Sequence, residues 1–349
     1  MNPLPGLDTS SRRVALAVLR LGPVSRTELG RVLGLSAPSL TRLTKPLVKE
    51  GLLLEGAPVA PLTTGRPAVP LDVDASRAHF LGVKFVRGEM YAVLTDLKGA
   101  VLVSEVFAGD YREPAAAVLA VAALMDWCGQ RQPDGIGVCL GASVDETGMV
   151  SEAEYMGWPQ LPLGTMIRER TGLPCVVEND VTAFTLAEHW FGFGRGVRDF
   201  LVVTLGAGVG AGLVCEDELV RGHRGRAGLI GGLRLDDGRR LQDVVETGAI
   251  VARLQDEALE QVLLDVAQAM GQLVGQLCAV TAPERVLVSG EGAQELTGRQ
   301  AKVLTQALFD GVARYTDLGR EQVKIDALNF AEWARGAATM AIRAHMTTA

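Results

Sequence analysis

The chain has 349 residues, 48% of them hydrophobic, which is enough to bury a large core and to build two or three globular units. It contains no uninterrupted apolar run of about 18 residues, and residues 1–10 have neither the basic start nor the apolar centre of a signal peptide. The sequence therefore predicts a cytoplasmic protein. Its five cysteines are scattered, with no close pair that would indicate a disulfide framework or a zinc site.

The charge is distributed unevenly along the chain. Taken as a whole, the net charge of -7 argues against a nucleic-acid-binding protein. Residues 1–70, however, hold nine Lys or Arg and four Asp or Glu, a net +5, so the remaining 279 residues carry -12. A basic N-terminal module on an acidic body fits a protein that binds DNA through one surface only.

Two short amphipathic helices are predicted within Val24–Leu52, after a first helix at Arg12–Leu21. They are hinged on a Gly-Leu-Ser turn, a pattern typical of a helix-turn-helix. Ser25, with Glu28 three residues later, and Ser36 stand where the two helices need N-caps. Each helix has one apolar face to bury, formed by Leu29, Val32 and Leu33 in the first and by Leu40, Leu43 and Leu47 in the second.

The second helix presents hydroxyl groups suited to base edges and cations suited to phosphates. The predicted DNA-binding residues on this helix are Ser36, Ser39, Thr41, Arg42 and Lys45, with Lys49 one turn further on. Pro46 removes a backbone hydrogen bond inside the helix, so we expect the reading surface to end at Lys45. The alternative interpretation is a small helical hairpin with a solvated basic face.

The next stretch indicates a wing. Gly51–Glu55 and Ala68–Val73 are predicted strands, separated by a Pro/Gly-rich loop. Arg66 lies in this loop between Gly65 and Pro67, where it is suited to a minor groove or to a phosphate. An ordinary solvated turn arginine fits the same pattern, and the residues alone leave both interpretations open.

From Ala75 the pattern changes to alternating strands and helices, which predicts an α/β body. Three strands joined by tight turns form an antiparallel meander at its start, at Phe80–Val86, Met90–Thr95 and Val101–Phe107. Later strands are expected at Gly135–Leu140, Cys175–Glu178, Phe200–Leu205, Leu213–Cys215, Val286–Ser289 and Val323–Ala327. Helices are expected at Glu113–Cys128, Leu161–Thr171, Val181–Phe191, Asp256–Val280, Ala301–Tyr315 and Trp333–His345.

Two junctions in the body are typical of ligand sites. Asn179 and Asp180 follow a strand and precede a helix, so they either bind a ligand or cap that helix. The glycine-rich run Gly206–Gly212 leads into a strand and not into the helix that a dinucleotide-binding motif needs. We therefore interpret it as a tight turn, which either permits positive φ angles or exposes N–H groups to an anion.

Several short motifs of the chain occur in an order known from one protein family. They are Thr95–Gly99, Glu178–Asp180, Thr204–Gly210, Ala227–Gly228, Ile230–Gly231, Val286–Gly292 and Gly336–Ala338, with a Gly-Arg-Pro wing at Gly65–Pro67. Together they resemble the ROK family (repressors, open reading frames and sugar kinases) over nearly the whole chain. The resemblance implies a tail at residues 1–10, a winged helix-turn-helix at 11–74 and an α/β actin-like/hexokinase-like ATPase domain at 75–349. Its lobe one is expected at residues 75–180 and 325–349, and its lobe two at 181–324.

Three departures from the kinase members of this family argue against catalysis. Their Asp-x-Gly-x-Thr phosphate loop corresponds to Lys84–Glu89, where the glycines that admit phosphate are lost and a lysine replaces the acid. Their cysteine-rich zinc segment corresponds to Gly232–Leu241, which contains no cysteine. Their sugar-binding Glu and His correspond to Leu229 and Gly232. The resemblance thus implies no catalytic residue, no cofactor and no metal in this chain.

One catalytic position of the kinase members is retained as Asp180, which matches their general base. A base without a phosphoryl-donor site transfers nothing, so Asp180 either binds a hydroxyl of an effector or caps a helix. By the resemblance, Gly141 also lines the sugar pocket, and Glu154 replaces its usual Asn. The candidate effector-binding residues are therefore Gly141, Glu154, Asn179 and Asp180.

The sequence as a whole predicts a transcription regulator, a repressor, with an N-terminal DNA-binding head. Its partners are expected to be a palindromic operator in double-stranded DNA and further copies of itself, as a homodimer or a dimer of dimers. A sugar-like small molecule is the candidate effector, and no membrane partner is expected. Two alternatives remain at this stage: a sugar kinase with an accessory DNA-binding head, and a dimerisation scaffold that has lost ligand binding.

Overall fold

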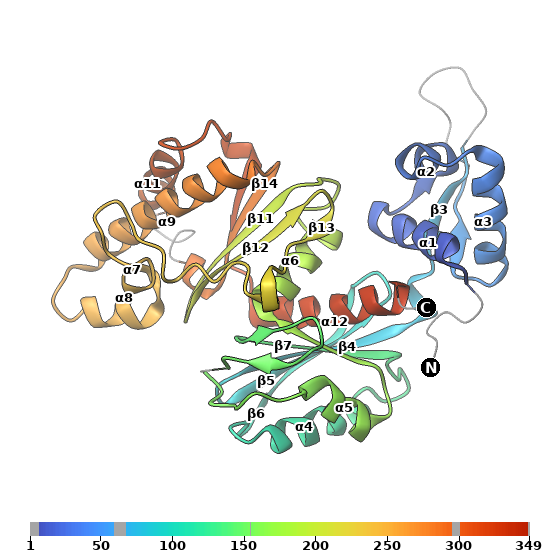
Figure 1. Ribbon diagram of the computed structural model, residues 1–349, viewed down its shortest axis with the longest axis horizontal. Helices are drawn as coiled ribbons and strands as arrows, with labels where there is room; N and C mark the ends of the chain where they lie inside the picture. The colour runs from blue at the N-terminus through green and yellow to red at the C-terminus, as the bar shows by residue number, and fades with distance from the viewer. Residues whose placement is uncertain (1–6, 59–67, 154, 295–300, 348–349) are drawn as a thin grey trace. The chain divides into compact units, whose positions relative to one another are not determined.

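The computed structural model describes residues 7–58, 68–153, 155–294 and 301–347. The chain divides into two compact units (Figure 1). The first comprises residues 1–142, 148–178 and 334–349, and the second comprises residues 143–147 and 179–333. The chain therefore returns to the first unit at Ala334, later than the boundary at 325 that the resemblance implied.

The N-terminal head belongs to the first unit and consists of three helices and a small sheet. The helices are α1 (Thr9–Leu21), α2 (Arg26–Leu33) and α3 (Ala37–Lys49), each preceded by a side-chain N-cap. An antiparallel sheet of order β1-β3-β2 follows them, with strands β1 (Val24–Ser25), β2 (Leu53–Glu55) and β3 (Pro70–Val73). Fully buried side chains hold the head together, among them Val14, Val18, Leu29, Leu40, Leu47 and Leu71. This is the arrangement of a winged helix-turn-helix.

One expectation about the head is wrong in detail, and a second stays a prediction. Helix α3 continues through Pro46 to Lys49, and the end of the reading surface at Lys45 is not tested by this. Pro46 has no N–H, so the Arg42 carbonyl loses its hydrogen-bond donor, but both residues are exposed and water can take the place of that donor. The buried Leu47 on the opposite face anchors the last turn of the helix. Val32, expected in the apolar face of α2, is 48% exposed.

The head joins the first sheet of the body through a short, bonded connection at residues 74–78. The Asp74 N–H donates to the Leu52 carbonyl of the head (3.0 Å), and the Asp74 carboxylate caps the turn that follows. The Lys98 ammonium, in the turn after the second strand of the body, forms an ion pair with Asp72 in β3 (2.7 Å). The connection is therefore bonded both to the head and to the body.

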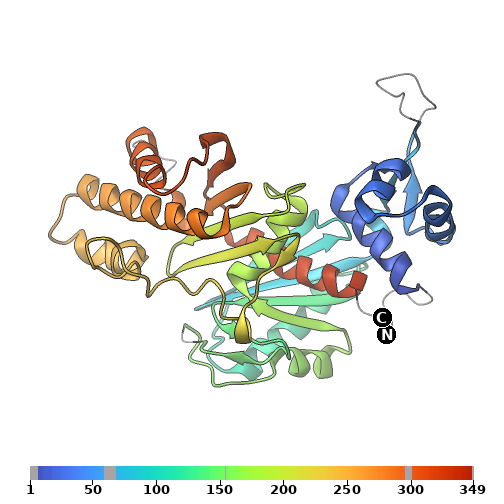
Figure 2. The same cartoon turned by 45° about the horizontal axis from the view of Figure 1, so that its top comes forward.

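The sheet of the first unit has the order β10-β7-β4-β5-β6. Its strands are β4 (His79–Val86), β5 (Glu89–Asp96), β6 (Val101–Ala108), β7 (Gly135–Leu140) and β10 (Cys175–Asn179). The first three form the antiparallel meander predicted from the sequence, and β7 pairs parallel to β4. Helices α4 (Pro114–Trp127) and α5 (Leu163–Thr171) cover one face, and α12 (Phe330–Thr347) covers the other (Figures 1 and 2).

The last helix, α12, packs directly against the backbone of this sheet. A Cβ added at Gly82 would lie 2.0 Å from the Ala334 carbonyl oxygen, and one added at Gly137 would lie 1.8 Å from that of Ala337. Neither distance is compatible with a side chain, so glycine is required on both strands where α12 crosses them. The end of the chain is thereby fixed to the centre of the first sheet.

The second unit contains a sheet of order β13-β12-β11-β14-β15. Its strands are β11 (Phe200–Leu205), β12 (Val209–Cys215), β13 (Glu218–Leu219), β14 (Arg285–Ser289) and β15 (Val323–Asp326). Its helices are α6 (Asp180–Phe191), α7 (Gln242–Val245), α8 (Thr247–Arg253), α9 (Leu259–Thr281) and α11 (Ala301–Val312). Shorter elements of the chain are β8 (Ser143–Val144), β9 (Val150–Ser151) and the 3-10 turns η1 (Ala75–Arg77), η2 (His223–Gly225), η3 (Glu291–Ala293) and η4 (Arg320–Gln322). The sequence patterns did not predict α7 and α8, which are too short to show a helical period.

Helix α9 forms the core of the second unit together with α11. Among the residues that the structure describes, it is the one helix long and apolar enough to cross a membrane by length and composition. Of its most apolar window, 67% is buried inside the unit. Met270, Leu273 and Val274 pack there with Leu308 and Val288. We therefore interpret α9 as a core helix.

Candidate nucleic-acid interface

The turn and caps of the helix-turn-helix are formed as the sequence indicated. Gly34 ends α2 in the left-handed conformation (φ 67°, ψ 31°), which a glycine adopts without strain. Ser25 accepts a hydrogen bond from the Glu28 N–H (3.1 Å), and Ser36 accepts one from the Ser39 N–H (3.4 Å). Both helices of the motif thus begin at their predicted N-caps.

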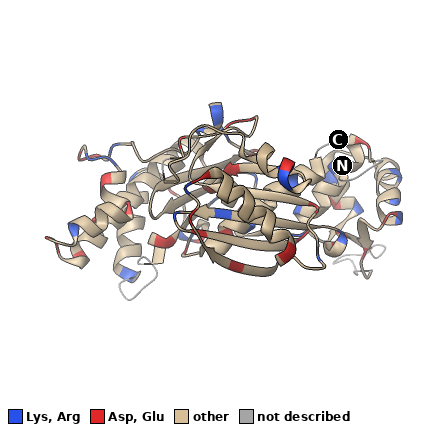
Figure 3. Ribbon diagram, turned by 90° about the horizontal axis from the view of Figure 1, so that it is seen from below, with Lys and Arg blue, Asp and Glu red and all other residues tan. Residues whose placement is uncertain are grey.

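The exposed face of α3 carries three cations that form no ion pair within the described parts of the chain. Arg42, Lys45 and Lys49 follow one another at spacings of three and four residues, and all are exposed. Among the described residues none of the three forms an ion pair or a hydrogen bond, whereas two other arginines of the head are neutralised by Glu28 and Glu55 (both 2.6 Å). Figure 3 shows basic residues along the helices of the head. This row is suited to the phosphates of a nucleic acid.

The predicted hydroxyl contacts lie at the N-terminal end of the same helix, where backbone N–H groups also attract anions. Ser36 is exposed and Ser39 is half-buried, and the Ser36 hydroxyl donates to the Ser39 hydroxyl (3.0 Å). Thr41 is exposed, and its hydroxyl donates to the Ala37 carbonyl (3.0 Å). Arg66, the predicted wing contact, lies outside the described residues.

The candidate effector residues are placed on several elements. Gly141 follows β7 in the first unit, and Glu154 lies outside the described residues. Asn179 ends β10, and its side-chain oxygen accepts from the Thr182 N–H (3.0 Å), which caps α6. The Asp180 carboxylate accepts from the neighbouring Val181 N–H (2.8 Å). Asn179 therefore caps α6, which is one of the two roles considered for it, and a role in effector binding stays a prediction.

A carboxylate side chain of the protein binds the backbone of the glycine-rich turn after β11. The Ala207 N–H donates to the Glu291 carboxylate (2.9 Å), and a Cβ at Gly206 would lie only 2.2 Å from that carboxylate. None of the glycines of residues 206–212 has a positive φ, so the suggestion that they serve a left-handed turn is wrong. Glycine at position 206 lets the Glu291 carboxylate approach the backbone this closely. The contact of Glu291 with this turn was not predicted from the sequence, because the only local feature of Glu291 is a glycine on either side.

The segment corresponding to the hexokinase-like phosphate loop is a plain hairpin. Lys84 is 4% exposed within β4 and pairs across the sheet with Tyr91. The turn that joins β4 to β5 is formed by Arg87 and Gly88, and Gly88 has a φ of 83°. The lysine thus occupies the interior of the sheet, where the kinase members resembled above place an acid.

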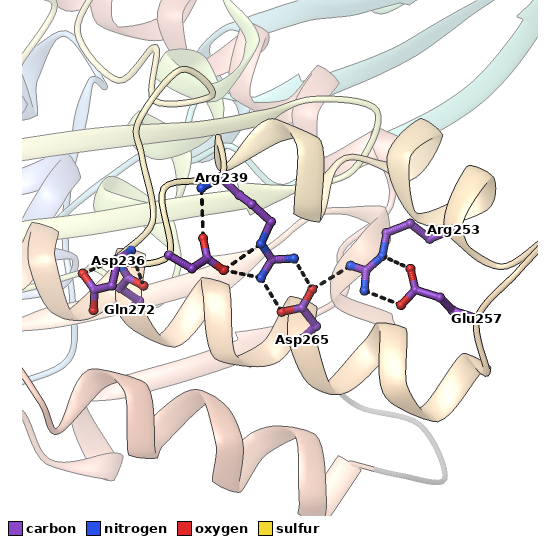
Figure 4. Close-up of polar contacts among 7 residues, drawn as sticks. Asp236, Arg239, Arg253, Glu257, Asp265 and Gln272 are labelled. Atoms are coloured by element: carbon purple, nitrogen blue, oxygen red, sulfur yellow. Dashed lines mark hydrogen bonds and ion pairs between the residues drawn. The ribbon is translucent and has the colours of Figure 1, made fainter.

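The segment that corresponds to the family's zinc loop is held by charged side chains (Figure 4). Arg239 binds Asp237 (2.6 Å) and, through two hydrogen bonds, Asp265 of α9 (2.7 and 2.8 Å). Asp265 also binds Arg253 (2.7 Å), which in turn pairs with Glu257 (2.8 Å). These five residues, here called the Arg239 network, fasten the loop and the end of α8 to α9.

The donor atoms of this segment do not fit zinc. It contains no cysteine or histidine, and its carboxylates already have partners: Asp237 binds Arg239, and Asp236 accepts from Gln272 (3.0 Å) and Tyr315 (2.7 Å). In the part of the chain that the structure describes, no group of three or more His, Cys, Asp or Glu could hold a metal ion. Arg239, which already pairs with Asp237, would repel a cation there further.

Replacing Arg239 by alanine is expected to lower the free energy of unfolding by about 1–2 kcal/mol, because Asp265 loses its bidentate partner. Arg239 and Arg253 hold the pKa of the Asp265 carboxyl below its ordinary value. The network therefore stabilises the fold above the unfolded pKa of an aspartate, and its contribution is lost as the pH falls through the lowered one. Urea unfolding at pH 7 and pH 3 measures this: the deficit of the variant should shrink at pH 3.

Two controls accompany this prediction. Arg112→Ala breaks an exposed ion pair with Asp110 and should leave stability nearly unchanged. A metal chelator should not change the unfolding midpoint of the unsubstituted protein. A chelator-induced loss of stability would contradict the conclusion that this loop is held without a metal.

Comparisons with known proteins agree with this architecture. The family model described as "ROK family" matches residues 81–248. The crystal structure of a ROK family transcriptional regulator, a homologue of the Mlc protein of E. coli, is similar over 97% of this chain and 96% of its own, with a TM-score of 0.76 and 23% identity. A ROK family glucokinase from Streptomyces griseus, in complex with glucose and AMPPNP, is similar over 76% of this chain and 99% of its own, with a TM-score of 0.62 and 22% identity.

The chain therefore contains a ROK-family domain, in the actin-like/hexokinase-like α/β fold predicted from the sequence. Its relatives in sequence include the DNA-binding transcriptional repressor Mlc of Escherichia coli, which is 29% identical over 230 residues. That match covers 64% of this chain and 56% of Mlc, so the chain spans little more than half the length of this relative.

Proposed function

We propose that this protein is a DNA-binding transcription regulator, a repressor, that uses α3 as its recognition helix. The observation that carries the proposal is the row Arg42, Lys45 and Lys49, whose side chains are exposed and form no ion pair among the described residues of an otherwise acidic protein. Ser36, Ser39 and Thr41 at the start of the same helix supply hydroxyl groups for base edges, and Arg66 in the wing supplies a further cation. The repressors among its sequence relatives support the same assignment.

The body serves, in this proposal, to pair the heads and to respond to an effector rather than to transfer phosphate. Phosphoryl transfer depends on positioned groups that neutralise the phosphates. Here the Glu291 carboxylate accepts a hydrogen bond from the Ala207 N–H of the glycine-rich turn, and its negative charge would repel phosphates. The buried Lys84 lies at the position that corresponds to the phosphate loop. A coupled ADP-release assay over hexoses and amino sugars is expected to show no turnover; robust turnover would favour a sugar kinase instead.

The effector, a sugar-like small molecule, is proposed to contact Gly141, Glu154, Asn179 and Asp180. Hydroxyl groups suit the amide of Asn179 and the carboxylate of Asp180. A cytoplasmic location and a pair of heads on a palindromic operator belong to the same proposal. A thermal-shift screen of sugars and sugar phosphates separates an effector domain from a ligand-free scaffold, since a bound effector raises the melting temperature.

The proposal is tested by recovering the DNA that the tagged protein binds across the genome and by titrating the recovered fragments with purified protein. A regulator of this kind should yield a small set of fragments that share a palindrome. Their affinity should fall steeply as salt rises, because phosphate contacts release counterions. Uniform binding to all fragments at the same affinity would contradict sequence-specific recognition.

A further inference from the structure

Arg26 connects three elements of the head through one side chain. It is the first residue of α2, directly after the N-cap Ser25. Its Nη2 donates to the Glu55 carboxylate at the end of β2 (2.6 Å), and its Nε donates to the Thr44 hydroxyl of α3 (3.5 Å). These two partners lie 29 and 18 positions away along the sequence. The Arg26 guanidinium therefore links α3 and the small sheet to the start of α2.

The two partners of Arg26 belong to the elements that the proposed function uses. Thr44 is fully buried in the core of the head and lies in α3 directly before Lys45. Glu55 is the last residue of β2 and pairs with Leu71 of β3, so it lies at the base of the predicted wing. The Arg26 side chain is 30% exposed, so its contacts are partly shielded from water. A shift of α3 relative to the sheet would break at least one of its two hydrogen bonds.

Another ion pair of the head offers a comparison. Arg31 pairs with Glu28 at the same distance (2.6 Å), but both residues belong to α2, and their side chains are 74% and 47% exposed. A pair within one helix supports that helix and cannot hold it against another element. The ion pair of Arg26 with Glu55 joins α2 to β2. Its loss therefore affects how the elements of the head are placed relative to one another.

We propose that Arg26 is a positioning residue for DNA recognition, which holds α3 and the base of the wing in one relative placement. This inference rests on the proposed function. Base readout requires side chains held within about 0.5 Å of their productive geometry by the groups behind them. Phosphate contacts of long, flexible cationic side chains tolerate displacement better. Loss of the Arg26 contacts should therefore reduce sequence discrimination more than overall affinity.

Two variants that remove opposite charges test this role. Arg26→Ala and Glu55→Ala break the same ion pair, the first by removing a cation and the second by removing an anion. Because DNA is a polyanion, a purely electrostatic effect would weaken binding in the first variant and strengthen it in the second. Lost positioning should instead lower the discrimination ratio in both, which is the affinity for an operator divided by that for an unrelated duplex. We expect a fall of about tenfold in each, the effect of one lost base contact.

The ratio is measured with the full chain by mobility-shift titration at fixed salt, on a recovered operator and on an unrelated duplex of equal length. Arg31→Ala is the matched control, because it removes a cation and an ion pair from the same helix, and it should keep the ratio of the unsubstituted protein. Each titration is made well below the unfolding midpoint of the variant, measured by circular dichroism. A merely stabilising role of Arg26 would lower that midpoint and leave the ratio unchanged. Glu55→Ala alters a side chain that is 48% exposed, so it provides the test even where Arg26→Ala fails to fold.

The outcomes separate this inference from the proposed function. A ratio that stays unchanged in either Arg26→Ala or Glu55→Ala would overturn the inference, and so would a ratio that falls equally in Arg31→Ala. In these cases the unsubstituted protein still prefers the operator, so the proposed function stands. An unsubstituted protein that prefers no sequence would refute the proposed function and this inference with it.

Discussion

Replacing Arg42 and Lys45 together by alanine is expected to weaken operator binding about a hundredfold and to leave the head folded. Both side chains are exposed and make no ion pair among the described residues, so the fold does not depend on them. We expect each lost phosphate contact to cost about 1.4 kcal/mol of binding free energy, which is tenfold in affinity, so two lost contacts correspond to about a hundredfold. A mobility-shift titration at fixed salt measures the affinity, and circular dichroism measures the unfolding of the variant.

Salt dependence separates this effect from a general loss of charge. Each lost phosphate contact should reduce the slope of log affinity against log salt by about 0.9 per head. The matched control is Lys302→Ala with Arg314→Ala, which removes the same charge from exposed positions of the second unit and should leave affinity unchanged. If both double variants lost affinity equally, α3 would not be the recognition helix.

Replacing Gly137 by alanine is expected to destabilise the protein by about 3 kcal/mol or more, the upper range for overpacking. The new Cβ would lie 1.8 Å from the Ala337 carbonyl oxygen and 2.4 Å from its carbonyl carbon. Both are backbone atoms of α12, so no side-chain rotation relieves the clash, and the helix must move off the sheet. Urea unfolding measures the loss, which should appear as a lower midpoint.

The matched control for this prediction is Gly248→Ala. Gly248 lies in α8, and a Cβ there meets nothing within 4 Å. Alanine is favoured over glycine in a helix by about 1 kcal/mol, so this variant should be as stable as the unsubstituted protein or slightly more so. Equal stability of both variants would mean that α12 tolerates displacement from the sheet.

Local sequence signals predicted the head and most of the body. The caps Ser25 and Ser36, the apolar spacing of Leu40, Leu43 and Leu47, and the turns of the meander all act over a few residues, and the structure confirms them. Pro46 could not show how far α3 continues, because the general cost of an interior proline does not include the buried residues that anchor the helix beyond it.

Contacts between residues distant in sequence were not predictable. Glu291 reaches Ala207 across 84 positions, and Arg239 reaches Asp265 across 26. The local sequence around a charged loop residue does not show whether its side chain is solvated or forms an ion pair, because the tertiary fold determines which partner lies beside it. The loss of the zinc ligands was visible in the sequence, but the Arg239 network that fastens this segment was not. The predicted roles of Gly141, Asp180 and the DNA-binding residues stay predictions.

The short connection between head and body has a consequence for the operators of the proposed regulator. The Asp74 N–H donates to Leu52 of the head, and Lys98 of the body forms an ion pair with Asp72 in the strand before it, so the connection is bonded on both sides. Each base pair inserted between two half-sites turns one relative to the other by about 35° around the duplex. A regulator with flexible connections would tolerate such insertions, whereas a regulator with a short, bonded connection is expected to bind operators of one half-site spacing only.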